Sequence, residues 1–180
     1  MSVLVSRSGV PASPIGSTAL KRRAERMLEA LALSAAELSI MVCDDATIHA
    51  LNRTHRRKNK PTDVLAFALR EGKPVPGAET LLGDVVISLD TALRQARERG
   101  HSLWAEVTLL LAHGLLHLIG YDHQTDAEER RMNARADMLI AAASPRVTRG
   151  VRPPVDKSRT KRRSSRPERR SRAARPRPRT

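Results

Sequence analysis

The sequence His-Gly-Leu-Leu-His-Leu-Ile-Gly-Tyr-Asp-His, residues 113–123, is the stretch around which the rest of this chain is organised. His113 and His117 are four residues apart, so on an α-helix both side chains project from one face, one turn apart. Gly120 is expected to end that helix, because glycine enters the left-handed conformation of a C-cap without steric cost. The following bend would bring His123 toward the other two histidines. The stretch therefore predicts a metal site with three imidazole ligands.

Such a ligand set indicates a catalytic metal. Catalytic zinc sites keep three protein ligands and one open position, whereas structural zinc is usually enclosed by four ligands rich in cysteine. This chain has a single cysteine, Cys43, and no fourth histidine beside the stretch. The alternative is a purely structural triplet of buried histidines, which would need a hydrogen-bond partner for every ring nitrogen.

The histidine spacing is also that of the metzincin proteases, with one difference. Those proteases carry Glu directly after the first histidine, as the general base. Here that position is Gly114. A glycine inside a helix costs roughly 1 kcal/mol relative to alanine, which suggests compensation by the close approach of a substrate or another backbone. The pattern favours metal chemistry and disfavours peptide hydrolysis by the usual route.

The charge of the chain is concentrated at one end. Residues 1–144 hold 18 Lys and Arg and 17 Asp and Glu, whereas residues 145–180 hold 15 and 2. The second segment is rich in Arg, Pro and Ser and cannot bury enough apolar surface to fold. We predict one domain at residues 1–144 and a disordered basic tail at residues 145–180. The tail is suited to bind RNA through phosphate charge; the alternative is a solubilising extension.

Several features indicate a cytoplasmic protein. A lone Cys43 cannot form an internal disulfide, which suits a reducing compartment. The first twenty residues lack the pattern of a signal peptide. The most apolar stretch, residues 107–119, is too short to span a bilayer. We therefore expect no membrane association.

Hydrophobic periodicity and capping signals predict alternating strands and helices. Strands are expected at residues 2–5, 38–43, 64–68 and 83–88. Helices are expected from Ser17 to about 33, after Asp44 and Asp45, from 90 or 91 to Gly100, from Ser102 through the first two histidines, and after the capping box formed by Thr125 and Glu128. Residues 53–60 are expected to be a basic loop and residues 72–77 a turn. This pattern implies an α/β or α+β fold with a small, partly parallel sheet and a buried central helix that carries the histidines.

Three segments resemble the YbeY family, the bacterial endoribonucleases of rRNA maturation. Residues 113–123 match the family signature H-G-x-L-H-L-x-G-Y-D-H at every fixed position. Residues 51–67 are similar to its L-N-x-x-x-R…T-D-V-L-S-F segment, with Ala66 where serine is usual, and residues 83–88 to its G-D-I-x-I-S strand. The resemblance covers roughly residues 36–140, and the basic tail has no counterpart in it.

The resemblance implies an α+β fold in which a four-stranded mixed sheet packs with about five helices. It implies one Zn²⁺ per chain, held by His113, His117 and His123. It further implies a single-strand-specific endoribonuclease that acts on small-subunit rRNA and the ribosome, in rRNA maturation and ribosome quality control. Arg56 would be a functional residue of the active cleft, consistent with the ability of arginine to bind a phosphodiester through paired N–H donors. Composition alone does not single out Arg56 from the other basic residues around it.

Some questions remain open at the level of sequence. Asp122 is expected to orient a histidine or fix the turn. The attacking group could be water or the 2′-hydroxyl of RNA, and the metal could be nickel or another ion that prefers imidazole. Two other functions fit the same residues: an RNA- or ribosome-binding assembly factor with a structural metal, and a protease-like metallohydrolase with an unusual base. The sequence indicates no oligomeric state.

Overall fold

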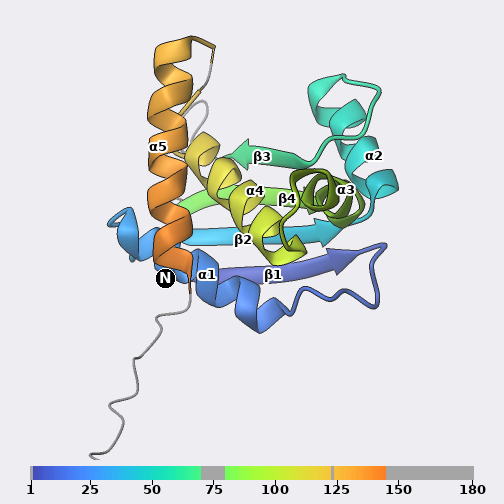
Figure 1. Cartoon of the computed structure of the whole chain (residues 1–180), viewed down its shortest axis with the longest axis horizontal. Helices are drawn as coiled ribbons and strands as arrows, with labels where there is room; N and C mark the ends of the chain where they lie inside the picture. The colour runs from blue at the N-terminus through green and yellow to red at the C-terminus, as the bar shows by residue number, and fades with distance from the viewer. Residues whose placement is uncertain (1, 70–79, 123, 145–180) are drawn as a thin grey trace, which may run out of the picture. The chain divides into compact units, whose positions relative to one another are not determined.

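The computed structural model describes residues 2–69, 80–122 and 124–144 (Figure 1). The strands are β1 (Ser2–Ser8), β2 (Glu37–Cys43), β3 (Val64–Ala68) and β4 (Leu81–Ser88). The helices are α1 (Ser17–Ala30), α2 (Asp45–Arg56), α3 (Leu89–Arg99), α4 (Leu103–Leu118) and α5 (Asp126–Ala143). The expected α+β fold is thus confirmed. The predicted turn at residues 72–77, His123 and the predicted tail lie outside the described residues.

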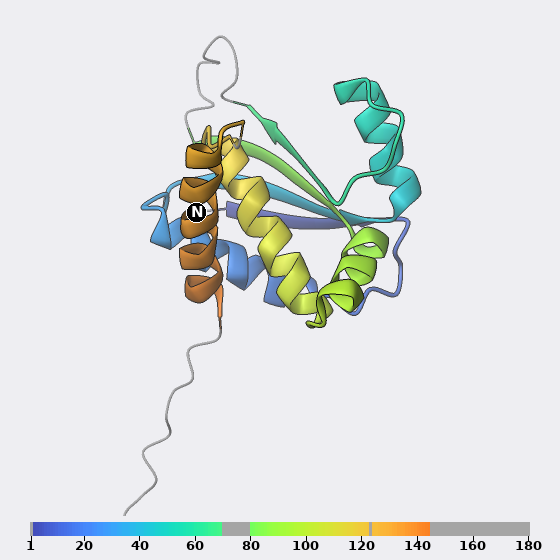
Figure 2. The same ribbon diagram turned by 45° about the horizontal axis from the view of Figure 1, so that its top comes forward.

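The four strands form one mixed sheet in the order β1-β2-β4-β3. β1, β2 and β4 run parallel, and β3 pairs antiparallel to β4, so β1 and β3 are the edge strands. Successive side chains of a strand point to opposite faces of the sheet. Ile40, Val85 and Ile87 accordingly join the core under α1, α4 and α5, whereas Cys43 and Val86 pack on the other face with Ile48 of α2. Figure 2 shows the sheet lying between α2 and the helices α1, α4 and α5.

α4 is the central helix of the domain. The consecutive residues Leu110, Leu111 and Ala112 are all buried although they point in different directions around the helix, as expected for a helix that is apolar nearly all round. It packs against α3, α5, β3 and β4. The least buried side of the helix is the stripe of Ala105, Leu109, His113 and His117, which follow one another at intervals of four residues, so the two histidines lie on its most accessible face.

The capping signals largely predicted the helix boundaries. Asp44 and Ser102 accept hydrogen bonds from the first turns of α2 and α4, and Gly100 ends α3 in the left-handed conformation. The capping box of Thr125 and Glu128 is formed at α5. Among the described residues, no helix is long and apolar enough to cross a membrane.

Three helices have boundaries that differ from the prediction. α1 ends at Ala30 rather than near residue 33, and its N-cap is Gly16, which offers no side-chain cap, rather than Ser17. α3 is capped by the Ser88 hydroxyl, which accepts from the Thr91 N–H, so the helix starts at Leu89. α2 continues through the basic segment to Arg56, because its last turn closes when the N–H of Arg57, at φ 55°, reaches the Asn52 carbonyl.

Candidate metal centre

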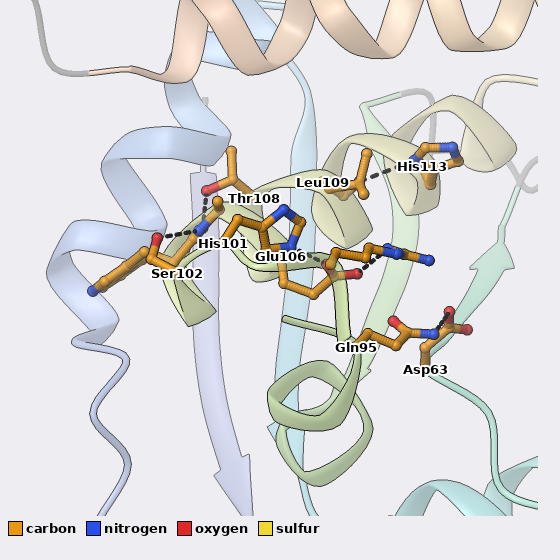
Figure 3. Close-up of polar contacts among 11 residues, drawn as sticks. Asp63, Gln95, His101, Ser102, Glu106, Thr108, Leu109 and His113 are labelled. Carbon is orange, nitrogen blue, oxygen red and sulfur yellow. Dashed lines mark hydrogen bonds and ion pairs between the residues drawn. The ribbon is translucent and has the colours of Figure 1, made fainter. Parts of the chain in front are cut away.

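His113 and His117 lie one turn apart on α4, half-buried, as predicted. Nδ1 of His113 is 3.1 Å from the Leu109 carbonyl oxygen (Figure 3), and Nδ1 of His117 is 3.0 Å from the Tyr121 carbonyl oxygen. A carbonyl oxygen only accepts, so each Nδ1 must donate its proton. The neutral form of each ring then has its lone pair on Nε2, which is the tautomer of a metal-binding histidine whose other nitrogen is held by a backbone group.

The end of α4 places the carbonyl that holds His117. Gly120 adopts φ 88°, and its N–H donates to the His117 carbonyl at 3.1 Å. The N–H of Tyr121 donates to the Leu116 carbonyl at 3.0 Å. This is the pair of bonds of a Schellman motif, with glycine at the left-handed position. The predicted helix end is confirmed, and it turns the Tyr121 carbonyl back toward the ring of His117.

His123, the predicted third ligand, lies outside the described residues. Within the described part of the chain, no three His, Cys, Asp or Glu side chains are arranged to hold a metal ion. Two imidazoles one turn apart, each with Nδ1 held by a backbone carbonyl, fit two ligands of Zn²⁺. The three-histidine site therefore stays a prediction. The structure describes the orientation of two of its three rings, those of His113 and His117.

Gly114 faces the sheet. A Cβ at this position would lie 2.6 Å from Cγ1 of Val85 on β4 and 3.4 Å from Cγ2 of Val64 on β3. The expected close approach exists, but side chains of the sheet make it, not a substrate or a backbone. Position 114 therefore has no room for the glutamate that metzincins carry there, and any general base must come from elsewhere.

Arg56 ends α2 and reaches the edge strand β3. Its Nη2 donates to the Ala66 carbonyl oxygen at 2.6 Å, and its guanidinium carbon lies 5.9 Å from the centroid of the Phe67 ring. The side chain is exposed. A guanidinium has five N–H donors, so this anchor leaves donors for another acceptor.

Strand β3 lies next to both predicted parts of the site. On its α4-facing side, Val64 approaches Gly114, and Ala68 lines the same pocket as His117. Ala66 lies between them on the same strand and packs against the main core. The structure thus brings the two histidines together and fixes Arg56 to the neighbouring edge strand.

Asp122 is exposed, and its Oδ2 accepts from Nε2 of Gln124 at 2.6 Å. This contact lies in the connection between the end of α4 and α5. The predicted role of Asp122 in orienting a histidine or fixing the turn stays a prediction.

A buried charge cluster at the start of α4 was missed by the sequence analysis. Glu106 is fully buried, and its Oε1 accepts from Nη1 of Arg99 at 2.6 Å. Its Oε2 contacts Nε2 of His101 (Figure 3). The signal was a single Glu inside the apolar run of residues 103–111. The cluster ties the α3–α4 connection to the helix that carries the histidines.

Comparison with known proteins gives consistent matches. The family described as Endoribonuclease YbeY matches residues 12–144. The relative from Geobacter metallireducens is 44% identical over 130 residues, covering 71% of this chain and 87% of the relative. The relative from Pelotomaculum thermopropionicum is 48% identical over 124 residues, covering 67% and 82%. Both are named Endoribonuclease YbeY. The solution structure of TM1509 from Thermotoga maritima has the same fold, with a TM-score of 0.55 at 24% identity over 78% of this chain and 89% of that one.

The fold, the histidine-bearing helix and these matches define the class of the protein as a nuclease, a hydrolase of the endoribonuclease kind. The chain belongs to the Endoribonuclease YbeY family. The resemblance noted in residues 51–67, 83–88 and 113–123 is thereby confirmed.

Proposed function

We propose that this chain is a zinc-dependent endoribonuclease, specific for single-stranded RNA, that acts in the cytoplasm in small-subunit rRNA maturation and ribosome quality control. Its family supports an rRNA-maturation endoribonuclease as the general activity. The strongest structural support is the His113 and His117 pair, with each Nδ1 held by a backbone carbonyl. His123 would complete the ligand set for one zinc per chain.

The residues of the chain have separate tasks in this proposal. Zinc held by the three histidines would supply a Lewis acid and a water of lowered pKa for phosphodiester hydrolysis. Arg56 binds the phosphate through the N–H donors that its bond to Ala66 leaves available. Asp122 steadies the turn after α4. The basic residues 145–180 add affinity for RNA that depends on salt and not on sequence.

The experiment compares the wild type with His117→Ala, Arg56→Ala and the control Arg53→Ala, since Arg53 is an exposed arginine one turn earlier on α2. Each protein is assayed on a single-stranded RNA, on the same RNA annealed to its complement, and on a peptide library. Zinc per chain is measured by elemental analysis.

The proposal expects cleavage of the single strand only, about one zinc per chain, and loss of cleavage in His117→Ala and Arg56→Ala but not in Arg53→Ala. His117→Ala should also lose zinc, whereas Arg56→Ala should keep it. RNA binding without metal-dependent cleavage would instead indicate an assembly factor. Peptide cleavage alone would indicate a protease-like hydrolase.

A further inference from the structure

A pocket of about 420 Å³ lies directly beside His117. Its walls come from the end of α1, the end of α4, strand β3 and helix α5, and they include the apolar side chains of Leu31, Leu33 and Ile119. This volume lies within the range of sites for small ligands, which are mainly apolar with a few polar groups that fix orientation. The polar side chains among the described lining residues are those of His117 and Arg135.

Arg135 is the unusual member of this set. It is half-buried on α5, yet it has no carboxylate partner in the described part of the chain. Its Nη1 contacts Sδ of Met138 at 3.7 Å, a weak acceptor, and its Nε is shielded from solvent without any acceptor. A partly desolvated guanidinium without an anion is unfavourable, and an arriving anion removes that cost.

The positive charge of Arg135 in the pocket lining favours an anionic ligand. Among the described residues that line the pocket none is acidic, so a cationic side chain lies beside a partly apolar cavity. An arginine pairs with phosphate through two parallel N–H donors, and its plane can also stack on a nucleobase. A ligand with a flat apolar part and an attached phosphate matches both features. A nucleotide has this composition.

We propose that the pocket between His117 and Arg135 is a nucleotide subsite, which takes one unpaired base of the RNA against Leu31, Leu33 and Ile119 while Arg135 binds the attached phosphate. This inference rests on the proposed function, because it places the subsite next to the predicted metal centre. It also gives a physical reason for the preference for single strands. A base can enter the pocket only if it is unstacked and unpaired, which costs a few kcal/mol in a duplex.

The test measures binding of a nucleoside monophosphate and of ribose 5-phosphate to the zinc-loaded, full-length protein by calorimetry. Wild type is compared with Arg135→Gln, Arg135→Lys and Leu33→Ala. The matched control is Arg130→Gln, which removes the same charge from an exposed position of α5 outside the pocket. Melting temperature and zinc content of each variant verify folding, and kcat and KM are determined on single-stranded RNA.

If the pocket is a nucleotide subsite, the nucleoside monophosphate should bind more tightly than ribose 5-phosphate. Arg135→Gln should weaken nucleotide binding about tenfold or more, as expected for a lost charge-assisted hydrogen bond. Arg135→Lys should recover part of that loss, and Arg130→Gln should stay within about twofold of wild type. Leu33→Ala should weaken the nucleotide but leave ribose phosphate unchanged. On RNA, Arg135→Gln should raise KM and retain kcat.

Equal affinities for nucleotide and sugar phosphate would overturn the subsite, as would equal losses in Arg130→Gln and Arg135→Gln. A fall in kcat at constant KM would do the same. A different result would contradict the proposed function. If the wild type binds the nucleotide through Arg135 but cleaves no RNA, the subsite proposal stands and the proposed endoribonuclease activity is wrong. Normal cleavage with no effect of Arg135→Gln would refute the subsite alone.

Discussion

Gly114 of α4 lies against Val85 of β4 so closely that a single added carbon would stand 2.6 Å from Cγ1 and 3.1 Å from Cγ2 of the valine. The helix that carries His113 and His117 therefore packs closely on the sheet at Gly114, the position between the two histidines that has no side chain. Glycine at this position therefore serves the packing of α4 on the sheet. The same packing excludes a general base there.

We predict that Gly114→Ala destabilises the protein by about 1 kcal/mol. Alanine improves helix propensity by about 1 kcal/mol, but overpacking a well-packed core typically costs 1–3 kcal/mol, and Val85 is fully buried and branched at Cβ. The free energy of unfolding in urea measures the balance. Adding Val85→Ala should relieve the clash, so the double mutant should be more stable than the sum of the two single changes indicates. A stabilising Gly114→Ala would contradict this packing account.

The difference between what the sequence predicted and what it missed follows from the range of the interactions. Caps such as the Thr125 and Glu128 box, and the glycines at positions 100 and 120, act within a few residues, and all were predicted. The extent of α2 was not predicted. The end of this helix has a polar, loop-like composition, and the hydrogen bond from Arg57 to Asn52 that closes its last turn leaves no signal in the sequence. Arg135 and Glu106 gain their significance from residues on other elements, which periodicity cannot reveal. The histidine pair was predictable because its spacing alone places both rings on one face.

Two arginine ion pairs among the described residues should differ in strength. Glu106 is fully buried beneath Arg99, whereas Asp45 and Arg94, 2.8 Å apart, are both partly exposed. Breaking a buried pair from one side leaves an uncompensated charge and costs 3–5 kcal/mol when burial is complete, whereas exposed pairs contribute about 0–1 kcal/mol. Because Arg99 is itself 48% exposed and His101 still contacts Glu106, we expect Arg99→Ala to cost about 2 kcal/mol and Arg94→Ala below about 1 kcal/mol. Equal costs in chemical denaturation would contradict this ranking.

Cys43 should be inert in the folded protein. Burial raises the pKa of its thiol to about 12, with a further contribution from the negative charges of Asp44 and Asp45. The thiolate is the reactive form, so iodoacetamide at pH 8 should label the unfolded chain and not the native one. The unfolded thiol ionises near pH 9. The native state binds the proton more tightly above that pH, so its stability should fall between about pH 9 and 12. Cys43→Ala should lack this component, and rapid labelling of native protein would contradict the burial.

Gly120 and Gly100 offer a matched pair for testing how the end of α4 supports the metal centre. Both adopt positive φ, 88° and 69°, at the end of a helix, and an added Cβ at either position would meet nothing within 4 Å. Alanine at each should therefore cost about 1 kcal/mol through backbone strain alone. Only Gly120 positions the Tyr121 carbonyl that holds Nδ1 of His117.

Zinc affinity should separate the two variants. Groups that hold a ligating histidine typically contribute 10–100-fold to metal affinity, so Gly120→Ala should bind zinc at least about tenfold more weakly than wild type. Gly100→Ala, with the same loss of unfolding free energy, should bind zinc normally. Competition with a chromophoric chelator measures both affinities, and urea denaturation verifies that the two variants are equally destabilised. If both variants bind zinc like wild type, the carbonyl of Tyr121 does not orient a ligand. If both are weakened equally, the effect is general destabilisation and not the turn after α4.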